Sequence, residues 1–199
     1  RRGAAGAIRG WQVPYDNPAK LGGIMTRRFG RKIGVTSTAA ALTVLGAYLA
    51  RRWAERGLDY GETVPLAGDL FRLTLGENPG VAFGLLGGSP LVPWLSALAL
   101  VVFALYLARS LRDSRAGGVS LGLILGGGLA NLLDRLGDGR VTDYLDVGLG
   151  SWRWPTFNLP DAAITVGVFL VVWLLWRDAP HSTTGKEKNS RGLFERLLR

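Results

Sequence analysis

Two aspartates, Asp143 and Asp161, are the side chains of this sequence best placed to do chemistry. Asp143 lies in a short polar loop that follows an apolar segment, and Asp161 lies where the next apolar segment begins. Ionisable groups at such depth in a membrane are costly and therefore indicate function. Two carboxylates in one site can divide a single proton, so that one accepts a proton from water while the other donates to a carbonyl oxygen. The pair predicts hydrolytic acid–base chemistry at one membrane boundary.

The two carboxylates differ in their expected surroundings. Asp161 falls in the first turn of a predicted helix, where the positive end of the helix dipole stabilises an anion. Asp143 falls in a predicted loop. Coupled acids titrate with values that belong to the pair rather than to either member. We expect Asp161 to be the more readily ionised of the two.

Histidine, lysine and cysteine chemistry is excluded at the face where the aspartates lie. The only histidine, His181, lies in the C-terminal tail, so neither a Ser-His-Asp triad nor a histidine-based zinc site can form there. A Ser-Lys dyad is excluded as well, because the lysines lie in the tail or near the N-terminus; they are Lys20, Lys32, Lys186 and Lys188. The chain has no cysteine, so thiol chemistry is absent. Carboxylates remain as the catalytic candidates.

Several polar residues near the aspartates are candidates for supporting roles. Asn131, Asp134 and Arg135 have i, i+3, i+4 spacing, which places them on one face of a helix near its end. Arg135 could pair with a carboxylate and Asn131 could bind a substrate backbone, but a solvated helix-terminal cluster explains the spacing equally well. Asn158 fits a helix cap and Asn78 a turn.

Four apolar runs predict four transmembrane helices. The runs are Ile33–Ala50, Leu91–Ala108, Ala116–Leu133 and Ala162–Trp176. A run of about 18 residues gives roughly 27 Å of helix, which is enough for a bilayer core. The runs are apolar on all sides, whereas the helices of a soluble bundle would carry polar stripes. We expect helices at about 33–53, 91–109, 116–136 and 159–177.

The charge distribution predicts the orientation of these helices. With both termini in the cytoplasm, the inner segments 25–32, 109–117 and 177–199 hold 13 Lys and Arg against four acids. The outer segments 51–82 and 134–158 hold seven against nine. This bias follows the positive-inside rule. The basic residues are spread over loops rather than gathered on one face, so nucleic acid is not an expected partner.

The segments outside the helices are predicted as follows. Residues 1–24 show no helical period and are expected to be an extension outside the fold, which leaves 25–177 as the membrane domain and 178–199 as a basic cytoplasmic tail. Two short strands are expected at Glu62–Leu66 and Leu70–Leu75, in a small sheet on the membrane surface.

Three motifs, in order, resemble those of signal peptidase II, the prolipoprotein signal peptidase of bacteria. They are Asn78–Gly84 (NPGVAFG), Gly126–Asp143 (GGGLANLLDRLGDGRVTD) and Phe157–Ile164 (FNLPDAAI). The second and third together are highly specific in residue type and spacing. The resemblance covers roughly residues 33–177.

The resemblance implies an all-α polytopic membrane protein with four transmembrane helices, a small periplasmic β-cradle and a short periplasmic helix. It implies a monomeric endopeptidase of the inner membrane, with its site at the outer face, that cleaves diacylglyceryl-modified prolipoproteins before the lipidated cysteine. It implies inhibition by globomycin and no metal or organic cofactor. The family's catalytic aspartates fall on Asp143 and Asp161, and its supporting residues are Asn78, Asn131, Arg135 and Asn158.

The sequence departs from the family pattern at the end of the first helix. The family usually has an Asp-x-x-Ser/Thr-Lys element there, and the best alignment places Ala47 and Arg51 at its ends, so the acidic residue is missing. Pro160 and Pro79 are also unusual at their positions. The missing acid leaves open a membrane scaffold with a degenerate site, and the intramembrane carboxylates leave open a small proton-coupled carrier.

Overall fold

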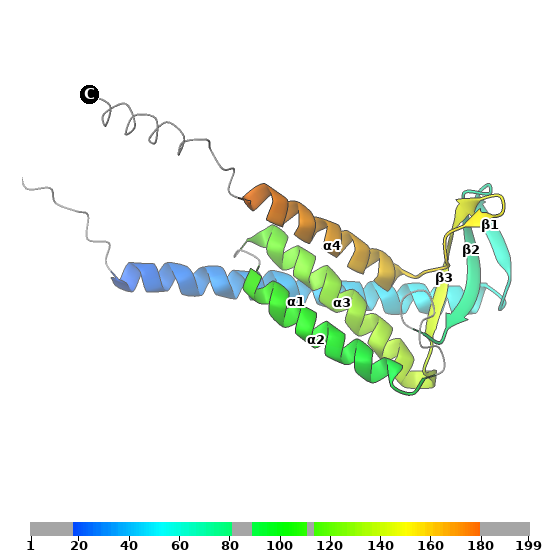
Figure 1. Cartoon of the computed structure of the whole chain (residues 1–199), viewed down its shortest axis with the longest axis horizontal. Helices are drawn as coiled ribbons and strands as arrows, with labels where there is room; N and C mark the ends of the chain where they lie inside the picture. The colour runs from blue at the N-terminus through cyan, green and yellow to red at the C-terminus, as the bar shows by residue number, and fades with distance from the viewer. Residues whose placement is uncertain (1–17, 81–88, 111–113, 180–199) are drawn as a thin grey trace, which may run out of the picture.

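The computed structural model describes residues 18–80, 89–110 and 114–179, which form four helices and one small sheet (Figure 1). The helices are α1 (Pro18–Gly57), α2 (Val92–Ser110), α3 (Arg115–Asp138) and α4 (Leu159–Asp178). The strands are β1 (Thr63–Ala67), β2 (Phe71–Asn78), β3 (Val141–Leu149) and β4 (Trp152–Arg153). The sheet has the order β1-β2-β3-β4, its neighbouring strands are antiparallel, and it lies at one end of the helices.

The helices carry the apolar surface of a polytopic membrane protein. Three segments in the described part of the chain are long and apolar enough to cross a membrane, namely Gly30–Gly57, Arg115–Asp138 and Leu159–Asp178. The apolar part of α2, Val92–Leu107, is shorter. Large apolar side chains on these helices face outward, as hydrocarbon requires; examples are Leu42, Leu98, Val102, Phe169 and Val172. Three of the four predicted transmembrane helices therefore have the length and composition of a span in the described residues, and the predicted helix at 91–109 is an apolar helix that is shorter.

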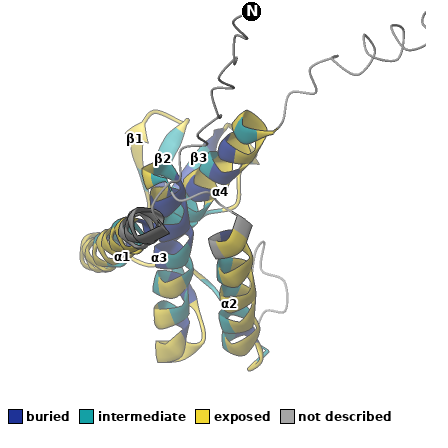
Figure 2. Cartoon of the chain, turned by 90° about the vertical axis from the view of Figure 1, so that its left-hand side faces the viewer, coloured by how far each residue is buried: buried dark blue, intermediate teal, exposed yellow. Residues whose placement is uncertain are grey.

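Helix α3 is the centre of the bundle and packs against the other three helices (Figure 2). Its Gly126, Gly127 and Gly128 face three different neighbours. An added methyl group would lie 2.7 Å from the Ala40 carbonyl oxygen of α1 at Gly126, 2.5 Å from the Pro160 carbonyl oxygen of α4 at Gly127, and 2.5 Å from the Leu100 side chain of α2 at Gly128. Glycine at these three positions therefore allows α3 to approach all three neighbouring helices closely.

The two expected strands are confirmed as β1 and β2, but the sheet is larger than predicted. Asp143 does not lie in a loop: it belongs to β3, where it pairs with Gly76 of β2. The prediction was wrong because β3 obtains its ladder of hydrogen bonds from β2, about 65 residues earlier, and two aspartates interrupt its apolar character. The strand therefore holds the Asp143 backbone rigidly.

Two further boundaries differ from the sequence predictions. Helix α1 begins at Pro18, inside the stretch expected to stand outside the fold, and continues to Gly57. Proline is favoured in the first turn of a helix because its missing N–H has no helical partner there in any case. Apart from α1 to α4, the described residues, which omit 81–88, contain no helix, so the expected short periplasmic helix is not found among them.

A small apolar cluster joins the end of α1 to the sheet. It consists of Ala54 from α1, Leu58 directly after the end of α1, Leu73 from β2 and Tyr144 from β3, all buried. Burial of such apolar surface is the main force that holds a sheet on a helix. Tyr144 directly follows Asp143, so the cluster anchors the part of β3 that carries this aspartate.

Candidate active site

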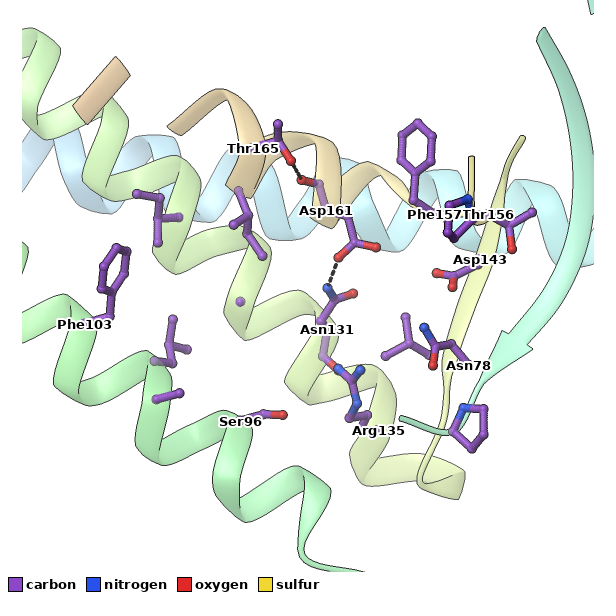
Figure 3. Close-up of a pocket in the computed structure, with 18 of the residues that line it drawn as sticks. Asn78, Ser96, Phe103, Asn131, Arg135, Asp143, Thr156, Phe157, Asp161 and Thr165 are labelled. Atoms are coloured by element: carbon purple, nitrogen blue, oxygen red, sulfur yellow. Dashed lines mark hydrogen bonds between the residues drawn. The ribbon is translucent and has the colours of Figure 1, made fainter. Parts of the chain in front are cut away.

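Asp143 and Asp161 line one cavity of about 1170 Å³. The walls come from α2, α3 and α4, from the ends of β2 and β3, and from the segment that leads into α4. Figure 3 shows the two aspartates facing the same space, Asp143 from β3 and Asp161 from α4, with Asn131 of α3 beside Asp161. The tertiary structure thus brings together two acids that the sequence separates by 18 residues.

Two asparagine amides connect the aspartates. Asn158 donates from Nδ2 to Asp143 Oδ1 at 2.8 Å and to Asn131 Oδ1 at 3.2 Å. Asn131 in turn donates from Nδ2 to Asp161 Oδ1 at 2.7 Å. Asn158 is only 1% exposed. Because a buried amide is costly unless all its groups are paired, this chain of hydrogen bonds holds the two carboxylates in a defined relation.

The same Asn158 begins α4. Its Oδ1 accepts the backbone N–H of Asp161 at 2.9 Å, and its carbonyl oxygen accepts the N–H of Ala162 at 3.1 Å. The N-cap predicted for Asn158 is therefore confirmed. The cap and the bridge to Asp143 use different ends of one amide group, so the start of α4 cannot move without disturbing the aspartates.

Asn78 and Arg135 form the wall of the cavity next to Asp143. The Oδ1 of Asn78 accepts the N–H of Gly80 at 3.0 Å, which is the turn role expected for it. Arg135 donates to the carbonyl oxygens of Gly80 at 2.6 Å and Asn131 at 3.3 Å. Its described hydrogen bonds thus go to backbone oxygens rather than to a carboxylate, and its charge reaches the site at longer range.

The environment of Asp143 favours its protonated form. Burial raises the pKa of the Asp143 carboxyl to about 7, and the negative charge of Asp161 adds to the rise. Hydrogen bonds from Asn78 and Asn158 and the positive charge of Arg135 oppose it. The residue is 3% exposed, so desolvation of the anion is the larger effect. Asp143 can therefore hold a proton near neutral pH.

The other aspartates of this region serve the framework. Asp134 forms an ion pair with Arg51 of α1 and accepts the backbone N–H of Thr142 at 2.9 Å, so it ties α1 and α3 to the start of β3. Asp146 forms an ion pair with Arg153 at 2.8 Å. Asp138 accepts the N–H of Arg140 at 2.9 Å.

A buried alanine, Ala47, stands in α1 at the position where the family pattern has an acidic residue. Ala47 is 4% exposed and lies in the helix packed on α3, one turn before Arg51. Arg51 of α1 forms an ion pair with Asp134 of α3.

Tyr144 is a residue of the site region that sequence reasoning missed. Its hydroxyl accepts the backbone N–H of Leu159, the first residue of α4, at 3.2 Å. Its position beside Asp143 was the available signal, but a tyrosine in an apolar stretch is usually read as part of a core.

A model of the Signal peptidase (SPase) II family matches residues 25–177. The chain belongs to the signal peptidase II family. A lipoprotein signal peptidase of Chlorobium phaeobacteroides (strain BS1) is 38% identical over 146 residues, which are 68% of this chain and 91% of the relative. The lipoprotein signal peptidase of Bacillus subtilis (strain 168) is 29% identical over 153 residues, 76% of this chain and 96% of the relative.

The fold is also shared with a solved structure. A structure described as a bacterial membrane enzyme, determined by the in meso method at 2.3 Å resolution, has a TM-score of 0.66 and 22% sequence identity. The likeness covers 76% of this chain and 93% of that one. The signal peptidase II relatives and this structure match nearly the whole length of the membrane domain.

Proposed function

We propose that this protein is a membrane-embedded aspartic endopeptidase that removes signal peptides from diacylglyceryl-modified prolipoproteins, with Asp143 and Asp161 as its catalytic pair. The observation that carries the proposal is the hydrogen-bonded chain from Asp143 through Asn158 and Asn131 to Asp161 beside one cavity. Family membership supports the reaction class, because the matched relatives are named lipoprotein signal peptidases.

The two aspartates take different roles at rest. Asp143 holds the proton, since burial and the charge of Asp161 raise its pKa to about 7. Asp161 is the base: it lies in the first turn of α4, where the helix dipole and the Nδ2–H of Asn131 stabilise its anion. Asp161 then accepts a proton from the attacking water while Asp143 donates to the carbonyl oxygen of the scissile bond. When the C–N bond of the tetrahedral intermediate breaks, Asp161 gives its proton to the leaving amine nitrogen and Asp143 regains a proton from a hydroxyl of the intermediate, which restores the starting state.

Asn131, Asn158 and Arg135 preorganise the two carboxylates for the reaction. Asn131 and Asn158 hold the carboxylates in place, so the geometry costs no reorganisation during the reaction. Arg135, fixed by Gly80 and by the carbonyl of Asn131, contributes a positive charge that limits the repulsion between two acids. Asn78 lies at the wall beside Asp143, where its amide faces the proposed site of the peptide.

The shape of the cavity suits a substrate that is part peptide and part lipid. Its polar end contains the aspartates, and its wall continues along α2 from Ser96 to Tyr106, about 15 Å of helix at 1.5 Å per residue. Leu100 and Phe103 of α2 and Ile164 of α4 give that part an apolar lining. A lipidated cysteine keeps its acyl chains in the bilayer, so an apolar channel next to the acids allows both parts to bind together.

The positive-inside bias favours cytoplasmic termini and an aspartate pair at the outer face of the inner membrane. A lipid-modified substrate presents its scissile bond at that boundary. The enzyme is proposed to act as a monomer without a metal or organic cofactor, since the two acids supply both proton transfers.

The test is cleavage of a lipidated prolipoprotein by the purified protein in detergent. We expect the wild type to release the signal peptide and Asp143→Asn to release none, because the acid can then neither donate nor regain a proton. Asp138→Asn is the matched control, since this exposed aspartate accepts a local backbone N–H and does not line the cavity. Equal cleavage by wild type and Asp143→Asn, or none by wild type, would reject the proposal.

A further inference from the structure

Tyr144 connects the strand that carries Asp143 with the start of α4, the helix that carries Asp161. It directly follows Asp143 in β3. There it is 3% exposed and packs with Ala54, Leu58 and Leu73. It does not line the cavity. Any effect on the reaction must therefore pass through other residues.

The residue contacts α4 and the segment before it at two points. Its backbone N–H donates to the carbonyl oxygen of Phe157 at 3.0 Å. Its hydroxyl accepts the N–H of Leu159 at 3.2 Å. The two contacts lie on either side of Asn158, the amide that bridges Asp143 and caps α4. One residue of β3 thus holds both neighbours of the central amide of the site.

The hydroxyl completes the hydrogen bonding of the first turn of α4. The first N–H groups of a helix have no helical partner and require another acceptor. Here Leu159 uses the Tyr144 hydroxyl, Pro160 has no N–H, Asp161 uses the Oδ1 of Asn158, and Ala162 uses the Asn158 carbonyl oxygen. Removing the hydroxyl would leave the Leu159 N–H without its partner in a partly buried position.

The hydroxyl is chemically suited to this role. Burial raises the pKa of Tyr144 above its ordinary value of 10.0, although the Leu159 N–H lowers it. The charges of Asp143 and Asp161 raise it further. The phenol therefore stays neutral over the working pH range and keeps a lone pair for the Leu159 N–H.

We propose that Tyr144 is a positioning residue of the catalytic pair: its hydroxyl fixes the first turn of α4, which carries Asp161, against the strand that carries Asp143. The inference rests on the proposed function. It differs from the roles of the asparagines because Tyr144 acts through backbone groups and touches neither carboxylate by a described hydrogen bond.

The first test compares Tyr144→Phe with the wild type in the prolipoprotein cleavage assay. The phenylalanine ring keeps the apolar packing and removes only the hydroxyl. Loss of one hydrogen bond that holds the geometry predicts a fall in kcat of about fivefold, with KM changed by less than about twofold because the cavity wall is untouched. A structural loss alone would lower the amount of folded enzyme, not kcat per folded molecule counted by size exclusion.

Tyr48→Phe is the matched control, because it removes a hydroxyl at an exposed position of α1. It should leave kcat and KM unchanged. An unchanged kcat per folded molecule in Tyr144→Phe, or a change confined to KM, would overturn the proposal.

The second test is amide hydrogen exchange at Leu159, and it requires no activity. In the wild type this amide should exchange slowly, and in Tyr144→Phe at least about tenfold faster, whereas Ala162 keeps its Asn158 partner. Rapid exchange at Leu159 in the wild type would overturn the proposal even if the variant does not fold. Absence of cleavage by the wild type with slow exchange at Leu159 would instead reject the proposed function and leave the contact standing.

Discussion

Replacing Asp143 with asparagine should stabilise the protein at alkaline pH and have little effect at acidic pH. Asparagine has the shape of a protonated aspartic acid, and its Oδ1 can still accept the Nδ2–H of Asn158 that Asp143 accepts at 2.8 Å. The substitution removes only the charge, whose burial is the first cause of the raised pKa. The variant therefore measures the free energy of keeping that anion inside the protein.

The magnitude follows from the shift of the pKa. Asp143 has an ordinary pKa of 3.8 and a folded pKa of about 7, a difference of about three units at about 1.4 kcal/mol each. A raised pKa means that the folded state binds the proton more tightly, so the stability contribution is complete below about pH 4 and is lost as pH rises through about 7. The upper limit of the loss is about 4 kcal/mol, and sharing of the charge with Asp161 reduces the expected value to about 2–4 kcal/mol.

The assay is thermal unfolding of the detergent-purified protein, followed by tryptophan fluorescence at pH 4.5 and pH 8. The stability that the wild type loses when Asp143 ionises should appear as a difference in Tm. At pH 8, the Tm of Asp143→Asn should be higher than that of the wild type by about 5–10 °C for a chain of this size. At pH 4.5, just above the ordinary pKa of 3.8, only a minor part of the stability is lost, so the Tm difference should be much smaller. Because the groups other than Asp143 and its coupled partner Asp161 titrate alike in both proteins, the difference isolates this pair.

Asp146→Asn is the control of opposite sign on the same strand. Asp146 is also buried but forms an ion pair with Arg153 at 2.8 Å, whose other acidic partner, Asp69, is farther away at 3.9 Å. Removing the closer partner should lower the Tm at pH 8. A Tm difference between Asp143→Asn and wild type that is equal at both pH values would refute the reasoning. So would a wild type more stable than Asp143→Asn at pH 8.

Three further predictions concern the hydrogen bonds and the packing of the site. Asn158→Ala removes the hydrogen bond to Asp143 and the cap of α4, and should lower kcat about 100-fold in protein that still purifies as a monodisperse species. A fall in kcat of less than about fivefold would contradict the bridging role of Asn158. Asp161→Asn should lower the pKa of Asp143 below about 7, because the charge of Asp161 contributes to it; a carboxyl ¹³C titration that shows no decrease would contradict this coupling. Gly122→Ala should destabilise the protein by about 1–3 kcal/mol in thermal unfolding, since the new methyl group would lie 2.5 Å from the Ala39 side chain. Gly137→Ala is the control, because a methyl group there meets open space and should not destabilise the protein. Equal Tm values for the two variants would argue against tight packing of α1 on α3.

The sequence alone determined the helices and the chemistry available to the site. Long apolar runs require helices in a membrane because only a helix satisfies its own backbone there. The aspartates were proposed as the acids from their places at the ends of those runs, and the absence of cysteine and the place of His181 removed the competing chemistries. The supporting roles of Asn131 and Asn158 came from the resemblance to signal peptidase II. These are local properties, which can be read without knowing the neighbours in space.

Only the tertiary structure decided how the acids relate to each other. Asp143 lies in a strand rather than a loop because β3 pairs with β2, a contact between distant segments that no local pattern encodes. The bridge through Asn158, the contact of Arg135 with Gly80 and the ion pair of Arg51 with Asp134 likewise join separate elements. The raised pKa of Asp143 follows from burial in that assembly, since desolvation exists only once the elements have packed around the carboxyl group.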